Sequence, residues 1–151
     1  MDAELAELYE KHAGEVLRFA TVVAGPASAD DVTSLVWLRV FGTDWTGVRD
    51  PRSYLFRCVV NTSHDLRRSD ERRRAREHRA QPPDTTGYDV MIRPEVRDAL
   101  QRLTARQRAA VYLHYWMDLD PAEIASQLGI SRRSIERELR AARALLKETL
   151  R

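Results

Sequence analysis

Apolar residues recur at three- and four-residue steps along most of the chain, a spacing that predicts α-helices. The first run extends from Leu5 to Ala20, and a second follows the interruption "AGPAS". Ser28 is a candidate N-cap for this second helix, and Asp30 and Asp31 would then lie in its first turn, where acidic side chains favour the helix dipole. The first 41 residues therefore predict two consecutive helices.

A third helix is expected from Pro51, because proline is tolerated in the first turn of a helix. Its apolar pattern continues to Leu66 and then runs into the charged segment "RRSDERRRAREHRA". The next segment, "QPPDTTGYD" at 81–89, has two prolines, one glycine and no apolar periodicity, which indicates a flexible linker. Helical patterning returns at Pro94. We therefore predict an all-α fold of two small helical domains, 1–78 and 94–151, joined by a linker at 79–93.

The segment "LDPAEIASQLGISRRSIERELRAARALL" has the spacing of a helix-turn-helix. Asp120 is positioned as the N-cap of its first helix, and small Ala125 allows a close approach of the second. Gly129 suits a tight turn because it tolerates positive φ, and Ser131 can cap the second helix. That helix would bury one apolar stripe, made of Ile135, Leu139, Ala142 and Leu146.

The second helix of this motif is expected to present arginine on its outer side. At 100° per residue, with Ile135 facing inward, the outward residues are Arg133, Arg137 and Arg140. Glu136 is four residues from both Arg132 and Arg140, and pairing with Arg140 has the more favourable order. Alternatively, Glu136 could accept a hydrogen bond from cytosine N4. Glu138 borders the apolar stripe and is expected to face protein, although both acids could also be solvated.

Charge is distributed unevenly along the 151 residues, although the net charge is only +2. Residues 1–50 are acidic, with a balance of −5, whereas residues 51–80 carry +5. Residues 81–100 carry −2 and residues 101–151 carry +4. Two basic blocks separated by an acidic one indicate two separate surfaces for a polyanion.

Several classes of function are disfavoured by the sequence. The single Cys58 can form neither an internal disulfide nor a zinc site, and the four histidines have no ligand spacing. No phosphate loop, nucleophile elbow or pair of hydrolytic carboxylates occurs. We therefore expect no enzyme, no cofactor and no bound metal. The acidic N-terminus and the lack of a long apolar run predict a cytoplasmic protein that does not insert into membranes. Trp37 and Trp116 lie in helical stripes and are expected to pack inside.

Taken together, these segments resemble the extracytoplasmic-function group of bacterial RNA polymerase sigma factors. "LYEKHAGEVLRFA" and "SADDVTSLVWLRVF" resemble the first helices of sigma domain 2, and "DPRSYLFRCVVNTSHDLRR" resembles the segment that recognises and melts the −10 promoter element. In that segment Asn61, Asp65 and Arg68 match the family pattern, and Tyr54 stands where tryptophan is usual. The last 50 or so residues resemble domain 4, whose final helix reads the −35 element.

The resemblance implies three sets of site residues. Contact with the −10 element is expected from Tyr54, Asn61, Asp65, Arg67, Arg68 and Arg72, because aromatic and polar groups can hold unstacked bases while arginines offset phosphate charge. Contact with the −35 element is expected from Arg132, Arg133, Ser134, Glu136, Arg137 and Arg140. Contact with RNA polymerase is expected from Asp30, Asp31, Ser34, Leu35 and Leu38.

The partners that the resemblance implies are the polymerase core, through its β′ clamp coiled coil and its β flap, promoter DNA, and an anti-sigma protein. This chain departs from the family at Ser34-Leu35, where Gln followed by an acid is common, and at Glu136 and Glu138, where bases are common. An exposed Leu35 would alter polymerase docking, unless a rotated helix buries it.

Two other functions are compatible with parts of the sequence. A LuxR-type helix-turn-helix regulator shares the "EIA..LGIS" pattern, but it leaves residues 1–70 unexplained. A sigma-like adaptor, which binds polymerase or a regulator without recognising a promoter, would be consistent with Leu35, Glu136 and Glu138.

Overall fold

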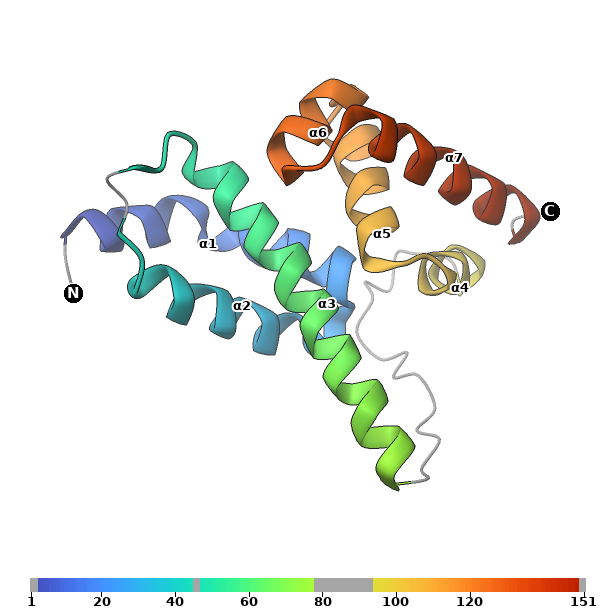
Figure 1. The fold of residues 1–151 in the computed structure, drawn as a ribbon, viewed down its shortest axis with the longest axis horizontal. Helices are drawn as coiled ribbons and strands as arrows, with labels where there is room; N and C mark the ends of the chain where they lie inside the picture. Colours follow the sequence, from blue (N-terminus) through green and yellow to red (C-terminus); the bar gives the residue numbers. More distant parts are fainter. Residues whose placement is uncertain (1–2, 45–46, 78–93, 150–151) are drawn as a thin grey trace.

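The computed structural model describes residues 3–44, 47–77 and 94–149, and all regular structure in them is helical. The prediction of an all-α fold is confirmed. Figure 1 shows the arrangement of the seven α-helices in this part of the chain, which are α1 (Ala3–Ala24), α2 (Pro26–Phe41), α3 (Pro51–Glu77), α4 (Pro94–Arg102), α5 (Ala105–Val111), α6 (Pro121–Leu128) and α7 (Arg132–Thr149). A π-helical turn, η2 (Tyr112–Trp116), extends α5.

Helices α1, α2 and α3 form the N-terminal half of the molecule. Their shared core contains fully buried Val16, Val36 and Leu55, and the rings of Phe19 and Phe56 stack with centroids 4.2 Å apart. Cys58 is buried in this core. Apolar side chains at three- and four-residue steps thus hold α3 across the other two helices (Figure 1).

The start of α2 differs from the sequence-based prediction. Gly25, with a left-handed φ of 89°, precedes the helix, and Pro26 occupies its first turn. Glycine adopts this φ without a Cβ clash, and proline is pre-organised for the first helical position. Ser28 therefore lies inside the helix and is not its N-cap, and Asp30 and Asp31 lie beyond the first turn.

The start of α3 is fixed by Asp50. One of its carboxylate oxygens accepts from the backbone N–H of Ser53 at 3.2 Å, and the other accepts from the Ser53 hydroxyl at 2.7 Å. The hydrogen bond from the Ser53 hydroxyl is the main reason that the pKa of Asp50 lies below its model-compound value of 3.8. Pro51 follows in the first turn, as predicted.

The C-terminal half, α4 to α7, contains the predicted helix-turn-helix. Asp120 caps α6 by accepting from the Glu123 N–H at 2.8 Å, and Gly129 ends that helix with φ at 67°. Ser131 caps α7, because its hydroxyl accepts from the backbone N–H of Ser134 at 3.1 Å. Of the predicted stripe, Ile135, Leu139 and Ala142 are buried, whereas Leu146 is half-buried near the end of α7.

The two halves pack against each other. Helix α5 contacts α1, and α6 contacts α3, so that one continuous hydrophobic core extends from Val36 through Phe19 to Leu113 and Ile124. The rings of Phe19 and Tyr112 meet across the boundary, with centroids 5.8 Å apart. The sequence left the arrangement of the two halves open, and the structure shows that they are in contact. None of the helices in the described ranges combines the length and apolarity that a membrane crossing requires.

We expect Asp50→Ala to lower the free energy of unfolding by about 0.5–2 kcal/mol at neutral pH, because the Ser53 N–H loses its acceptor. The folded-state pKa of Asp50 is depressed, so its contribution is present above pH 3.8 and is lost as the pH falls through the folded-state pKa. Urea denaturation from pH 7 to pH 3 measures this. Asp50→Asn, which keeps a capping oxygen but does not titrate, should be nearly as stable as wild type at neutral pH. An equal loss for Asp50→Ala at both ends of the pH range would contradict the capping role.

Candidate nucleic-acid interface

Five of the six predicted −10 residues lie along one stripe of α3. Their spacing of seven, four, three and four residues places them within about 60° of each other on the helix surface. Tyr54 is half-buried, and the other four are exposed, namely Asn61, Asp65, Arg68 and Arg72. The structure therefore brings an aromatic ring, two polar side chains and two arginines onto one line.

Tyr54, at the start of this stripe, is held in place by its neighbours. Its hydroxyl lies 3.5 Å from the Thr43 hydroxyl, and its side chain hydrogen-bonds the Cys58 thiol. Burial raises the pKa of that thiol, and the bond from Tyr54 opposes the rise. The tyrosine ring is therefore positioned before any ligand binds.

Arg67 lies on a different side of α3 from the stripe, about 140° away from Tyr54 at 100° per residue. Its Nε is 3.5 Å from Glu71, and it lines a pocket of about 620 Å³ between α3 and α4 that also contains Asp98. Arg67 is thus the one predicted −10 residue that the structure separates from the others.

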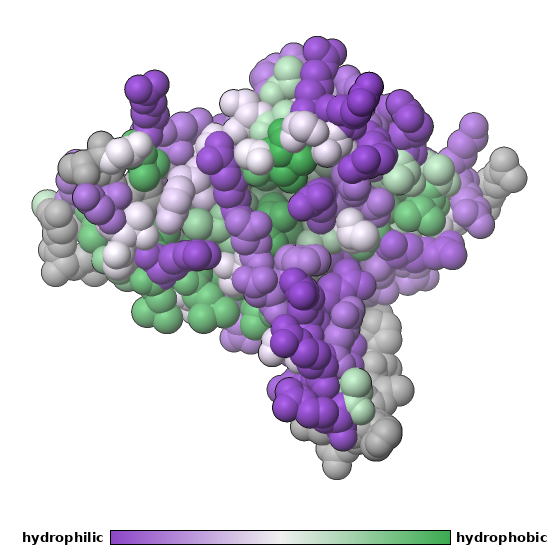
Figure 2. Space-filling view, in the orientation of Figure 1, coloured by the Kyte–Doolittle hydropathy of each residue, from purple (hydrophilic) through white to green (hydrophobic). Residues whose placement is uncertain are grey.

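The C-terminal end of α3 projects from the body of the molecule (Figure 1), and its surface is strongly hydrophilic (Figure 2). Arg72, Arg73, Arg74 and Arg76 are all exposed there. Asp70 lies 3.5 Å from Arg73, whereas Arg72 and Arg76 donate weakly to carbonyls of α3 itself, at 3.4 Å. Most of this positive charge is therefore available to a polyanion.

Helix α7 presents its predicted arginines to solvent, because Arg133, Arg137 and Arg140 are exposed. Arg132 Nε bonds Glu136 at 3.0 Å, so the ion pair forms with Arg132 and not in the predicted order with Arg140. Arg132 lies in the first turn, where the helix dipole disfavours a positive charge, and the carboxylate offsets that charge. Ser134 is half-buried and hydrogen-bonds the capping Ser131 at 2.8 Å.

Glu138 faces protein, as expected. It lines a cleft of about 410 Å³ together with Thr104 and Arg106 of the C-terminal half, and Asn61 and His64 of α3. The two acids of α7 therefore have different surroundings: Glu136 lies beside the outward arginines, and Glu138 lies toward the other half of the molecule.

All five predicted polymerase-contact residues lie on the exposed face of α2. Leu38 is 68% exposed and Leu35 is 44% exposed, so the unfavoured alternative of a buried Leu35 is wrong. Phe41, which the sequence analysis did not assign to the site, is also exposed and lies three residues beyond Leu38. Figure 2 shows the resulting patch over α2, and we call Leu35, Leu38 and Phe41 the α2 apolar surface.

The two tryptophans behave differently. Trp37 is buried, as expected, and its ring meets that of Tyr9 edge-on at 4.9 Å. The expectation that Trp116 packs inside is wrong, because it is 76% exposed and only one face of its ring stacks on Tyr112. The π-helical turn that contains Trp116 changes the helical register, which the apolar periodicity could not reveal.

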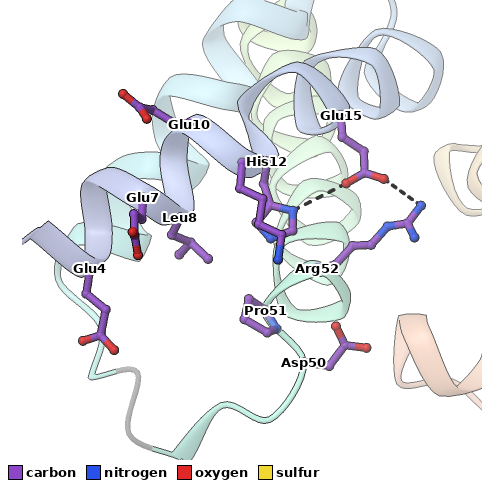
Figure 3. A pocket seen from close by; sticks show the side chains of 10 residues that line it. Glu4, Glu7, Leu8, Glu10, His12, Glu15, Asp50, Pro51 and Arg52 are labelled. Atoms are coloured by element: carbon purple, nitrogen blue, oxygen red, sulfur yellow. Dashed lines mark hydrogen bonds and ion pairs between the residues drawn. The ribbon is translucent and has the colours of Figure 1, made fainter.

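The N-terminal part of α1 lines an acidic pocket of about 970 Å³ beside the start of α3 (Figure 3). Glu4, Glu7 and Glu10 contribute carboxylates along α1. Glu15 accepts from Arg52 at 2.7 Å and lies 3.5 Å from His12. Within the described residues, no group of acidic, histidine or cysteine side chains has the arrangement of a metal site. This acidic face would repel phosphates, so it does not belong to the nucleic-acid interface.

Comparison with known proteins identifies the family. The family model for sigma-70 region 2 matches residues 8–74, and the model for sigma-70, region 4 matches residues 93–146. The RNA polymerase sigma-E factor of Streptomyces avermitilis is 30% identical over 97% of this chain and 85% of the relative. The ECF RNA polymerase sigma factor SigL of Mycobacterium tuberculosis is 30% identical over 98% of this chain and 89% of the relative. The chain belongs to the extracytoplasmic-function group of RNA polymerase sigma factors.

The match to sigma-70 region 2 covers residues 8–74, most of the segment that a LuxR-type regulator leaves unexplained. The assignment to the sigma factors therefore does not depend on the helix-turn-helix alone. Solved structures show the same fold. The sigma factor RpoE in complex with the anti-sigma factor NepR, from Bartonella quintana, has a TM-score of 0.70 at 18% identity and covers 99% of this chain and 98% of that chain. The PhyRSL–NepR complex from Sphingomonas sp. Fr1 has a TM-score of 0.67 at 17% identity and covers 98% of this chain and 88% of that chain.

Ile135 is fully buried in the core between α7 and α6. We expect Ile135→Ala to lower the free energy of unfolding by about 2–5 kcal/mol, because the substitution leaves a cavity. Arg133→Ala, on the exposed side of the same helix, should change it by no more than about 0.5 kcal/mol. Urea denaturation measures both. Equal small losses for the two variants would show that Ile135 is not a core residue.

Proposed function

We propose that this sigma factor directs core RNA polymerase to promoters by reading two DNA elements with two surfaces. Domain 1–78 recognises and melts the −10 element, domain 94–151 recognises the −35 element, and residues 79–93 link them. The observation that carries the proposal is that one chain of this family holds two separate exposed arginine surfaces, the stripe of α3 and the outer side of α7.

The outer side of α7 suits the major groove of duplex DNA. The groove admits an α-helix, and arginine binds guanine O6 and N7 with two hydrogen bonds. Arg133, Arg137 and Arg140 are the exposed candidates for base and phosphate contacts. Glu136 lies beside them and can accept from cytosine N4 through the carboxylate oxygen that does not bind Arg132.

The stripe of α3 suits a strand whose bases are unstacked. Unstacked bases bind aromatic faces and side chains that reach their hydrogen-bonding edges, while arginines hold the phosphates. Tyr54 supplies the aromatic face, and Asn61 and Asp65 supply groups that can hydrogen-bond base edges. Arg68 and Arg72 continue the same line toward the projecting basic end of α3 and can hold the phosphates.

Helix α2 suits a protein partner. Its exposed face joins two carboxylates, Asp30 and Asp31, to the α2 apolar surface. We assign this face to the β′ clamp coiled coil of polymerase, and we assign contact with the β flap to the domain 94–151. The two relatives named above are sigma factors. Their names support action by binding and not by catalysis, in the cytoplasm where transcription takes place. The sigma factor RpoE, whose solved structure has this fold, is bound there to the anti-sigma factor NepR, which supports an anti-sigma partner here.

Run-off transcription with purified core polymerase and a candidate promoter tests the proposal, and we expect transcripts that start at one site.

Leu38→Glu should weaken binding to core polymerase at least tenfold, because a carboxylate on the α2 apolar surface must lose its hydration. Leu17→Glu, at an exposed leucine of α1 outside that surface, is the matched control and should bind normally. If the chain does not bind core polymerase, the proposed function is wrong. Binding without transcripts would indicate the adaptor, and DNA binding without polymerase would indicate the regulator.

Glu136→Ala should change the preference at one base pair of the −35 element by about 1–3 kcal/mol, because the variant lacks the acceptor for cytosine N4. Competition binding of duplexes with single substitutions measures this preference. Glu138→Ala, at the acid that faces the cleft toward α3, should leave every base preference unchanged. A uniform change in affinity for all sequences would rule out base reading by Glu136 and leave it the role of positioning Arg132.

A further inference from the structure

Two arginines cross between the halves of the molecule in opposite directions. Arg57 of α3 donates from Nε to the Gln127 carbonyl and from an Nη to the Ser126 carbonyl, both at 2.8 Å. Arg108 of α5 donates from Nε and Nη2 to the Val23 carbonyl, at 2.9 and 2.7 Å. Each half therefore supplies a guanidinium to the other.

Both guanidinium groups bind the C-terminal end of a helix. The last four carbonyls of a helix lack partners within it and carry partial negative charge, which arginine can neutralise with several donors at once. Ser126 and Gln127 belong to the last turn of α6, and Val23 belongs to the last turn of α1. The reciprocal contacts thus satisfy backbone groups that would otherwise need water.

The turn of the helix-turn-helix leaves room for Arg57. A Cβ added at Gly129 would lie 3.1 Å from the Arg57 Nε, closer than side chains normally approach. Gly129 also has a φ of 67°, so the absence of a side chain serves both the turn and the contact. Arg52 pairs with Glu15 of its own half at 2.7 Å and adds a weak link across the boundary, because its Nη2 lies 3.9 Å from the sulfur of Met117.

This closed arrangement places the two DNA-reading helices, α3 and α7, too close together for a promoter. Asn61 of the −10 stripe and Glu138 of the recognition helix line the same cleft of about 410 Å³. The −10 and −35 elements are centred about 25 base pairs apart, which corresponds to about 85 Å along B-DNA at 34–36 Å per turn. The halves must therefore separate before each can occupy its element.

We propose that the free chain is latched in this closed, promoter-incompetent state, and that Arg57 is the latch. The regulatory part of this inference rests on the proposed function, whereas the closed state does not. Arg57 is distinguished from Arg108, which also donates to the Leu103 and Leu100 carbonyls and so supports the fold of its own half. Arg57 is exposed, and both of its hydrogen bonds described above reach across to α6.

Small-angle X-ray scattering of the full chain tests the latch. A compact chain of 151 residues has a radius of gyration of about 15 Å. Arg57→Glu, whose carboxylate is repelled by the carbonyl end of α6, should raise the radius toward the roughly 20 Å of two separated halves. Arg57→Lys, which keeps the charge but loses the fork, should lie between the two. Arg72→Glu is the matched control, because Arg72 is exposed on the same helix and donates to Arg68 of α3; it should leave the radius unchanged.

Cys58 distinguishes opening of the latch from unfolding. It is the chain's one cysteine and is buried within the N-terminal half, next to Arg57 in sequence. In Arg57→Glu it should react with a thiol reagent as slowly as in wild type. Rapid labelling would show that Arg57 maintains the N-terminal fold and would overturn the proposal. A wild-type radius near 20 Å, or an Arg57→Glu radius equal to that of wild type, would also overturn it.

Run-off transcription at limiting sigma factor tests the regulatory consequence. Arg57→Glu should reach half-maximal transcription at a concentration several-fold lower than wild type. If the variant opens but its half-maximal concentration equals that of wild type, the latch does not restrain promoter use and the regulatory inference fails. If neither protein supports transcription while the difference in radius remains, the proposed function fails and the closed state stands.

Discussion

Carbonyl groups at the ends of two helices determine how this molecule is put together. A helix that ends inside a protein needs donors for its last carbonyls, and α1 and α6 both receive them from an arginine of the opposite half. The guanidinium groups of Arg57 and Arg108 therefore combine helix termination with association of the halves. The apolar contact between Phe19 and Tyr112 adds area to the same boundary. Neither half presents its complete surface to solvent while these contacts persist.

Surfaces of different character lie on different helices. The projecting end of α3 and the outer side of α7 are basic, and the N-terminal part of α1 is acidic. The exposed face of α2 combines two carboxylates with the α2 apolar surface. A sigma factor must bind a protein and two nucleic-acid elements within one assembly. Separating the charges in this way prevents the protein-binding face from competing for phosphates, because like charges repel and Coulomb interactions between exposed groups decay within a Debye length.

The parts of the structure that local sequence determines were predictable. Asp120, Gly129, Ser131 and Ile135 specify the helix-turn-helix through interactions within a few residues, and the structure confirms each of them. The stripe on α3 and the exposed face of α2 follow from helical periodicity in the same way. The residues assigned to DNA and to polymerase stay predictions, because the structure contains no partner.

Other features depend on contacts between distant segments or on small changes of register. Arg57 and its acceptors on α6 are 69 and 70 residues apart in sequence, and Arg108 is 85 residues from Val23. No local pattern distinguishes these arginines from the solvated ones around them. The start of α2 depends on a positive φ at Gly25 and not on a side-chain cap. The exposure of Trp116 depends on a π-helical turn. Both features are set by local backbone conformation, which the spacing of apolar residues does not reveal.

The projecting end of α3 has a consequence for how binding and helix formation are coupled. Isolated helical segments are marginally stable in water, and adjacent arginines such as Arg72, Arg73 and Arg74 repel one another. A phosphate backbone lying along these side chains would reduce that repulsion and so favour the helical conformation to which it binds. A nucleic acid bound there would thereby stabilise the helix that binds it, and raising the salt concentration would weaken attraction to the ligand while it also screens the repulsion within the helix.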